Sequence, residues 1–293
     1  MADILFKHVT VVGVGLIGGS FAMAVRRAGL AQRITGWGGK RSLEIALERG
    51  IIDALEDSFD RKTRSDADLI YLAAPVSGII DFLQSRSKCL KPGAVLTDAG
   101  SSKVEICRAA RDALPSEVEF VGGHPMAGSH RTGVEYATAD LFEGAPYALT
   151  HANDPEKSSP GLERMRVLVG AIGATAVLLT PAEHDIAVAR VSQAPQLVST
   201  AIANAIARSG SEDLTGELAG TGLADMLRLA ESNWSVWEDI CRTNAHNIAD
   251  ALGEVGREVA ALREALEAGR FDALSAAFES GNVVSTTVRR RKR

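Results

Sequence analysis

The sequence lacks any apolar run long enough to cross a bilayer, since none approaches the roughly 18 residues of a spanning helix. It also has few cysteines: Cys89, Cys107 and Cys241 are widely separated, and no two of them form a CxxC pair. Closely spaced cysteines are typical of zinc sites and redox motifs, and dense cysteine frameworks are typical of secreted proteins. We therefore expect a cytoplasmic protein with no signal peptide, no membrane partner and no metal site.

An excess of basic residues is missing as well. The 293 residues include 32 lysines and arginines against 37 aspartates and glutamates, which gives a formal net charge of −5. Proteins that bind nucleic acid usually carry a basic face, so we expect no nucleic-acid partner. The one basic cluster, residues 289–293, has the character of a solvated tail.

The first part of the chain alternates short apolar runs with amphipathic stretches, which is typical of a doubly wound, mostly parallel α/β sheet of the Rossmann type. Strand-like runs rich in β-branched residues, or closed by glycine or proline, lie at residues 9–14, 33–37, 69–73, 94–97, 119–121, 147–150 and 174–179. Helical patterns lie between them at residues 19–28, 42–49, 76–89 and 162–172.

The pattern changes at Thr180, where Thr180-Pro-Ala-Glu183 predicts a capping box with proline at the first helical position. Beyond it, helical patterns follow one another at residues 185–208, 224–232, 234–266 and 271–288, without strand-like runs. We therefore expect a dinucleotide-binding domain over residues 1–180 and an all-helical substrate and dimerisation domain over residues 181–293. Apolar helix faces in the second domain favour a homodimer, although they could equally pack within one chain.

The strongest local motif is the glycine-rich stretch between the first predicted strand and the first predicted helix. Gly13 permits a tight turn, Gly15 lets the backbone approach a pyrophosphate, and Gly18 lets the helix pack closely on the sheet. In this context the motif predicts a dinucleotide site, and the alternative is a tight turn without a ligand. We expect cofactor contacts from this motif and from the end of the third predicted strand, at Gly13, Gly15, Leu16, Ile17, Gly18, Ala74 and Pro75.

The position about 20 residues beyond this motif is occupied by Gly38. NAD-binding proteins usually place an acidic residue there, on the ribose 2′-hydroxyl. This chain has no carboxylate nearby, and Lys40, Arg41 and Ser42 follow, which suits a 2′-phosphate. We therefore expect NADP to be favoured over NAD; the alternative is that the two cations only solvate a helix start.

A second cluster, residues 122–129, follows the strand-like run that ends at Val121. It holds His124 between two glycines and a proline. Ligands of open α/β sheets bind beyond the carboxyl ends of the strands, so His124 is expected to be rigid and close to the nicotinamide. That position suits a general base, although a single histidine taken alone is more often structural.

Several blocks of the sequence, taken in order, resemble the prephenate/arogenate dehydrogenase family of tyrosine biosynthesis. They are the glycine-rich block at residues 11–20, Asp-Ala-Gly-Ser-Ser-Lys at 98–103, Gly-His-Pro-Met-Ala-Gly-Ser at 123–129, residues 140–147, residues 180–185 and residues 225–230. The combination of the histidine block with the glycine loop is quite specific. The resemblance covers roughly residues 9–240.

The resemblance implies an oxidative decarboxylation of a cyclohexadienol. A base takes the ring hydroxyl proton while hydride leaves the same carbon for NAD(P)+, and loss of CO2 makes the ring aromatic. By position, the resemblance implies that His124 is the base, that Ser101 orients it, and that Arg228 binds a substrate carboxylate. It also places His184 beside the base or the substrate, and Trp237 in the wall of the pocket.

Each of these residues also has a structural interpretation. Arg228 could form a surface ion pair with Glu231 or Asp225, and His184 could be a polar residue in a capped helical turn. Trp234 is expected to be a core residue, one helical turn from Trp237.

The chain departs from the family pattern at two places. Where the family commonly has two histidines in Ser-His-Leu-Pro-His, this chain has Gln193 and Gln196. The second histidine helps to hold substrate, so we expect Gln196 at the substrate and leave the choice between prephenate and arogenate open. A basic residue expected before Asp225 is replaced by Ala224, and fewer cations favour zwitterionic arogenate over dianionic prephenate.

Two other functions fit parts of the pattern. One is a β-hydroxyacid or imine-reductase-like dehydrogenase, which typically relies on a lysine in its helical domain, whereas residues 185–208 contain none. The other is a non-catalytic nucleotide sensor, which has no need of a histidine beside the cofactor.

Overall fold

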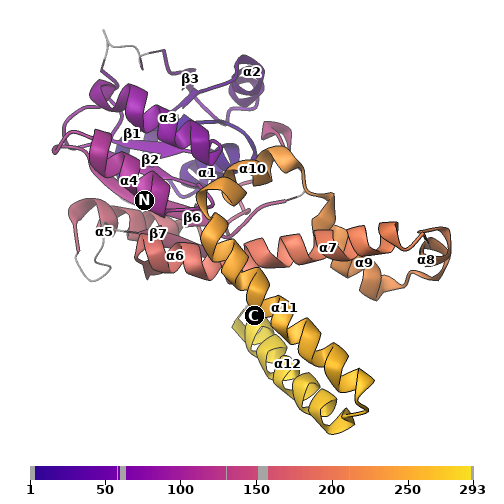
Figure 1. Cartoon of the computed structure of the whole chain (residues 1–293). Coiled ribbons are helices and arrows are strands. Elements are labelled where there is room, and N and C mark those ends of the chain that lie inside the picture. The colour runs from indigo at the N-terminus through magenta and orange to yellow at the C-terminus, as the bar shows by residue number, and fades with distance from the viewer. Residues whose placement is uncertain are drawn as a thin grey trace.

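The computed structural model describes residues 4–57, 59, 64–129, 131–150, 158–210 and 212–291 (Figure 1). The strands are β1 (Phe6–Val12), β2 (Ala31–Trp37), β3 (Ala54–Leu55), β4 (Leu69–Leu72), β5 (Val95–Asp98), β6 (Glu119–Pro125), β7 (Pro146–Thr150) and β8 (Thr175–Leu179). The helices that accompany them are α1 (Leu16–Arg27), α2 (Lys40–Glu48), α3 (Val76–Arg86), α4 (Val104–Ala113) and α5 (Pro160–Ala171), with short 3-10 turns η1 (Ser87–Cys89) and η2 (Val134–Tyr136).

The eight strands form one sheet in the order β3-β2-β1-β4-β5-β6-β7-β8, and only β6 and β7 pair antiparallel. Strand β4 has a continuously apolar sequence because both of its faces are buried. Tyr71 packs in the cluster under α1, α2 and α5, whereas Ile70 packs in the cluster under α3 and α4. Both faces of the sheet are therefore covered, as is usual for parallel sheets. The predicted Rossmann-type α/β fold followed by helices is confirmed.

Strand β6 is longer than the sequence pattern predicts. The apolar run ends at Val121, but β6 continues to Pro125 because β7 pairs with it, placing His124 opposite Ala148. The two intervening glycines are required by close packing. A Cβ atom on Gly123 would lie 2.5 Å from the Asp98 carbonyl oxygen, and one on Gly122 would lie 2.3 Å from Thr150 Oγ1. His124 is thus held inside the end of a strand rather than in the loop after it.

The chain after β8 is helical. It comprises α6 (Pro181–Val188), the π-helical turn η3 (Ala189–Gln193), α7 (Ala194–Arg208), α8 (Glu212–Leu218), α9 (Thr221–Leu227), the 3-10 turn η4 (Arg228–Glu231), α10 (Trp234–Thr243), α11 (Ala245–Glu267) and α12 (Phe271–Arg291). The predicted capping box at Thr180 and Glu183 is present. The predicted helix over residues 185–208 is divided by η3, because Pro195 lacks the N–H that a regular α-helix needs there.

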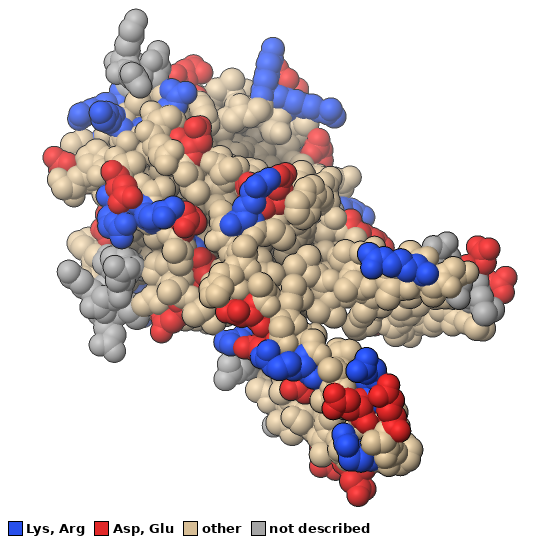
Figure 2. Space-filling view, viewed as in Figure 1, with Lys and Arg blue, Asp and Glu red and all other residues tan. Residues whose placement is uncertain are grey.

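The helical part buries little apolar surface of its own. One small cluster joins η3, α7, α10 and α11. Figure 1 shows the α7–α9 arm and the α11–α12 hairpin projecting away from the sheet, and Figure 2 shows the arm as largely uncharged, with charged side chains toward its tip. Helix α12 extends to Arg291, so the predicted basic tail is partly helical, and its last two residues lie outside the described residues. No described helix has the length and apolar character needed to span a membrane.

Candidate active site

The loop between β1 and α1 has the shape that a dinucleotide requires. Gly13 has φ of 89°, and a Cβ atom there would lie 2.4 Å from the Ala73 carbonyl oxygen. A Cβ atom on Gly18 would lie 2.1 Å from the Gly13 carbonyl oxygen, whereas nothing lies within 4 Å of one on Gly15. Two glycines are therefore fixed by packing, and the third leaves open space at the N-terminus of α1, where a pyrophosphate fits.

The other predicted cofactor positions surround this loop. Leu16 and Ile17 open α1, and Ala74 and Pro75 directly follow Ala73, whose carbonyl abuts Gly13. Gly38, with φ of 149°, places its Cα so that a Cβ atom would lie 3.5 Å from the Gly13 nitrogen. The segment Lys40, Arg41 and Ser42 forms the first turn of α2, which has no acidic residue. The structure thus brings both predicted parts of the cofactor site together.

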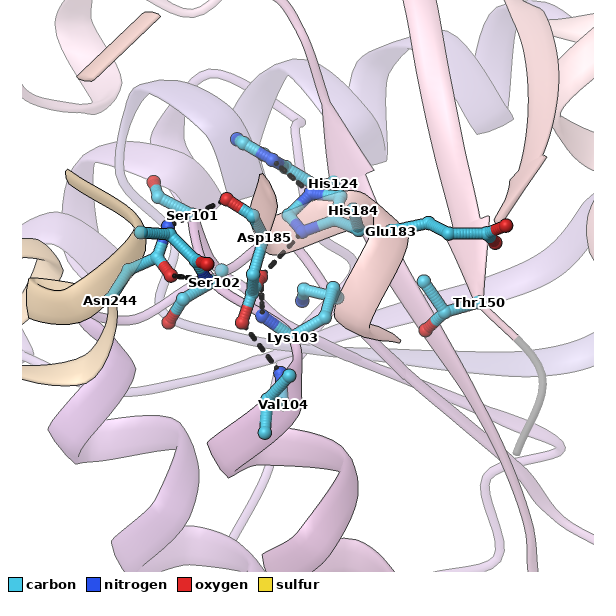
Figure 3. A network of polar contacts seen from close by, with 12 residues as sticks. Ser101, Ser102, Lys103, Val104, His124, Thr150, Glu183, His184, Asp185 and Asn244 are labelled. Atoms are coloured by element: carbon cyan, nitrogen blue, oxygen red, sulfur yellow. Dashed lines mark hydrogen bonds and ion pairs between the residues drawn. The ribbon is translucent and has the colours of Figure 1, made fainter. Parts of the chain in front are cut away.

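The predicted base belongs to a chain of three polar side chains (Figure 3). His124 Nδ1 lies 2.9 Å from His184 Nε2, and His184 Nδ1 lies 2.7 Å from Asp185 Oδ1. A carboxylate only accepts hydrogen bonds, so His184 Nδ1 donates to Asp185, and a neutral His184 must accept at Nε2 from His124 Nδ1. This arrangement fixes the tautomer of His124 and leaves the lone pair on its Nε2. No hydrogen bond within the described residues uses that nitrogen.

The carboxylate at the end of this chain is anchored by the N-terminus of α4. Asp185 Oδ1 accepts from the Lys103 amide at 2.6 Å, and Oδ2 accepts from the Val104 amide at 2.9 Å. His184 and Asp185 are both fully buried. Backbone amides at a helix N-terminus stabilise a buried negative charge, so Asp185 connects α6 to the Rossmann part of the molecule at the site itself.

A buried ion pair that the sequence analysis gave no role holds the strand beneath the base. Lys103 Nζ contacts the Asp98 carboxylate and donates to the Gly123 carbonyl oxygen at 2.8 Å. Asp98 also accepts from the Gly123 amide at 2.9 Å and from the Gly100 amide at 2.8 Å. Because both the amide and the carbonyl of Gly123 form hydrogen bonds with this ion pair, the position of the neighbouring His124 is fixed. A hint in the sequence is an aspartate that ends an apolar strand with a lysine five residues later.

Burial keeps both histidines neutral. It lowers the pKa of His124 well below the usual range, and the neighbouring His184 ring and Lys103 ammonium disfavour a positive charge on His124 and so lower that pKa further. Burial also lowers the pKa of His184, against the opposing effect of Asp185. At neutral pH His124 therefore presents an unprotonated Nε2, which is the form that can accept a proton.

The remaining predicted residues lie in the loop before α4 and on α10. Ser101 is in the loop between β5 and α4, and its carbonyl accepts from Gln193 Nε2 at 3.2 Å (Figure 3). Trp237 is half-buried against the small helical core. Trp234, expected in the core, is instead 61% exposed, because the predicted helix faces no packed layer at its first turn.

Two predicted substrate residues lie at the junction of α7 and η4. Arg228 opens η4 with an exposed side chain, and in the described part of the chain it forms no ion pair with Glu231 or Asp225. Gln196, on α7, donates through Nε2 to the Leu229 carbonyl oxygen at 2.5 Å. The amide of Gln196 is thus engaged next to Arg228.

The chain matches two models of one protein family. One family model, the prephenate dehydrogenase nucleotide-binding domain, matches residues 21–191, and a second, the prephenate dehydrogenase dimerization domain, matches residues 180–280. The prephenate dehydrogenase of Bacillus subtilis is 34% identical over 258 residues, which are 87% of this chain and 69% of that protein.

Solved structures agree with the family models. The A. aeolicus prephenate dehydrogenase in complex with hydroxyphenyl propionate and NAD+ has a TM-score of 0.88 at 27% identity, covering 96% of this chain and 98% of that one. The Synechocystis arogenate dehydrogenase has a TM-score of 0.81 at 29% identity, covering 96% and 100%. Since the first family model alone matches more than half of the chain and the two together match residues 21–280, we conclude that the chain belongs to the prephenate dehydrogenase family.

Proposed function

We propose that this protein is an NAD(P)-dependent dehydrogenase that oxidatively decarboxylates prephenate or arogenate to 4-hydroxyphenylpyruvate or tyrosine. The observation that carries the proposal is the free Nε2 of a neutral His124, fixed by His184 and Asp185. Family membership supports this reaction over a β-hydroxyacid-type dehydrogenase. A nucleotide sensor would not need a histidine whose tautomer is fixed in this way.

In the proposed reaction, His124 Nε2 accepts the proton of the ring hydroxyl as the C–H bond of the same carbon breaks. NAD(P)+, when bound at the glycine loop, supplies the hydride acceptor. The C–C bond to the ring carboxylate then breaks, CO2 leaves, and the electron pair stays in the ring, which becomes aromatic. His124 returns its proton to the phenolate oxygen. The cation that forms on His124 during the reaction is stabilised through His184 by the Asp185 carboxylate.

Arg228 is proposed to bind a substrate carboxylate, because a guanidinium presents paired donors that match a carboxylate. Ser101 is proposed to orient the ring hydroxyl, and Trp237 to line the pocket. Arg228 is the one cationic residue in residues 221–237, because Ala224 occupies the position where the family pattern has a basic residue. We therefore propose that zwitterionic arogenate is accepted at least as well as dianionic prephenate.

For the cofactor, we propose that NADP is preferred over NAD. The first turn of α2 offers two cations, a hydroxyl and no carboxylate beside the glycine loop. The A. aeolicus relative was solved with NAD+, so the proposal of NADP rests on the residues of this chain's own loop.

For the assembly, we propose a homodimer built by the helical part. A family model for a dimerization domain matches this region. Apolar side chains stay exposed on α11 and α12 in the single chain, namely Val259, Leu266, Phe271, Phe278, Val283 and Val284. A second copy that covers them would remove this surface from water.

The test is NAD(P)H formation by the purified protein with prephenate and with arogenate, each with both cofactors, together with identification of the product. We expect turnover with NADP and arogenate, and an aromatic product that has lost CO2. Reduction of cofactor without decarboxylation, or no turnover with either substrate, would contradict the proposal.

A further inference from the structure

The two glutamines that replace the family histidines lie one turn apart, at the junction of η3 and α7. Gln193 is 2% exposed, and Gln196 is 6% exposed. Residues three apart on a helix share a face, so both side chains leave the helix on the same side. In each side-chain amide, both the nitrogen and the oxygen form hydrogen bonds with the protein, although sequence analysis expects Gln196 to contact substrate.

Gln193 binds the loop that carries Ser101. Its Nε2 donates to the Ser101 carbonyl oxygen at 3.2 Å, and its Oε1 accepts from Asn244 Nδ2 at 2.7 Å. Asn244 Nδ2 also donates to the Asp185 carbonyl oxygen at 2.8 Å. The orientation of each amide is determined, because a carbonyl oxygen can only accept. Gln193 therefore connects the end of η3 to the side of the site that holds the base.

Gln196 binds the turn that carries Arg228. Its Nε2 donates to the Leu229 carbonyl oxygen at 2.5 Å, and its Oε1 accepts from the Ser232 hydroxyl at 3.1 Å. One turn further along α7, Ser199 Oγ donates to the Met226 carbonyl oxygen at 2.6 Å. The segment from Met226 to Ser232, which contains η4, is thus held to α7 by three hydrogen bonds.

We infer that Gln196 is a positioning residue that acts on substrate through Arg228, and that Gln193 and Gln196 together set the spacing between the Ser101 loop and Arg228. The role of Arg228 rests on the proposed function. A glutamine amide keeps its donor and acceptor at every accessible pH, whereas a histidine loses its acceptor on protonation. The hydrogen bonds that Gln193 and Gln196 form therefore do not change with pH.

The test is a double-mutant cycle. Gln196→Met keeps the side-chain length but removes both hydrogen bonds, so KM for the ring substrate should rise about five- to tenfold, with kcat and cofactor KM within about twofold. In an Arg228→Gln background, the same change should raise KM less than about twofold further, because coupled residues are not additive. An equal rise in both backgrounds would show that Gln196 contacts substrate itself and would overturn the inference.

A second readout does not depend on activity. Gln196→Met should increase amide hydrogen exchange in residues 228–232 by at least about fivefold, because η4 loses its tie to α7. Thr200→Ala is the matched control, since among the described residues the Thr200 hydroxyl bonds within α7 alone, to the Gln196 carbonyl. Ser232→Ala, which removes one bond to Gln196, provides a milder variant if Gln196→Met does not fold.

The two proposals fail in different ways. No turnover by the parent protein would contradict the proposed function but leave the exchange experiment decisive for the tie between α7 and η4. Unchanged exchange at residues 228–232 in both variants would overturn the inference even in a fully active enzyme.

Discussion

At the scale of single residues, the site depends on which nitrogen of His124 carries the proton. The Asp185 carboxylate determines this. It fixes the proton on His184, and His184 in turn fixes the proton on His124. Sequence analysis identifies His124 from its glycine and proline neighbours, because these are local. Only the family resemblance places His184 beside the base or the substrate, and nothing local in the sequence assigns a role to Asp185, because both residues approach His124 through the packing of α6 on α4.

Removing the negative charge of Asp185 should therefore slow the chemical step. Asp185→Asn leaves a neutral group where the charged one stabilises the cation on the histidine pair. A charge-assisted hydrogen bond is worth about 1.5–3 kcal/mol, so kcat should fall about ten- to a hundredfold. Glu183→Gln is the matched control, because glutamine keeps the capping box and Glu183 lies on the exposed side of α6. Equal kcat in the parent and Asp185→Asn would remove Asp185 from the mechanism.

The pH dependence should report the unusual state of His124. The base is active only when unprotonated, so kcat/KM should rise with pH through the pKa of His124 and then remain constant. Burial, followed by His184 and Lys103, lowers that pKa, so the acidic limb should lie well below the ordinary histidine value of 6.5. A pH–rate profile with an acidic limb at or above 6.5 would contradict the described environment of His124.

At the scale of elements, the sequence predicts most of the sheet because buried parallel strands form apolar runs that end at glycine or proline. The extension of β6 through Gly122 to Pro125 is not predictable in this way, since it is produced by pairing with β7. The turn η3 is not predictable either, because a proline inside an apolar helix permits a kink, a break or a π turn. Helix α8 and the two-residue strand β3 have patterns too short to recognise, whereas α4, with ten residues, is missed although its sequence is amphipathic.

Helix α2 carries the prediction for the cofactor. Each charge-assisted contact to a 2′-phosphate is worth about 1.5–3 kcal/mol, so Lys40 and Arg41 should give at least about tenfold preference for NADP. The double variant Lys40→Ala/Arg41→Ala should lose that preference while keeping its kcat/KM with NAD. Steady-state kinetics with both cofactors and one substrate check this. A preference for NAD in the parent would refute this assignment of Lys40 and Arg41. So would a double variant whose ratio of kcat/KM with NADP to kcat/KM with NAD equals that of the parent.

At the scale of the whole molecule, the helical part has little core of its own and leaves apolar side chains on α11 and α12 exposed. This exposed apolar surface is what the proposed homodimer would cover, and it agrees with the match to a dimerization-domain family model. The sequence shows these apolar faces but not whether they pack within one chain. The structure shows that α11 and α12 pack on each other and still leave Phe271 69% exposed.

The assembly should respond to charge placed on this surface. Light scattering should give twice the 30.9 kDa chain mass for the parent and a single chain mass for Phe278→Asp, because Phe278 is 73% exposed on α12. Val167→Asp is the control, since Val167 is similarly exposed on α5, on the Rossmann part. A monomeric parent, or a dimer that Phe278→Asp leaves intact, would place the interface elsewhere.

The claim that joins all three scales is that His124 is the general base of an oxidative decarboxylation. The most direct measurement is kcat for NAD(P)H formation with arogenate and prephenate, compared between the parent and His124→Asn, with cofactor affinity measured separately. Loss of a general base typically costs about 10²–10⁴-fold, so kcat should fall by that factor while cofactor affinity stays within about twofold. A His124→Asn enzyme with near-normal kcat would contradict the account.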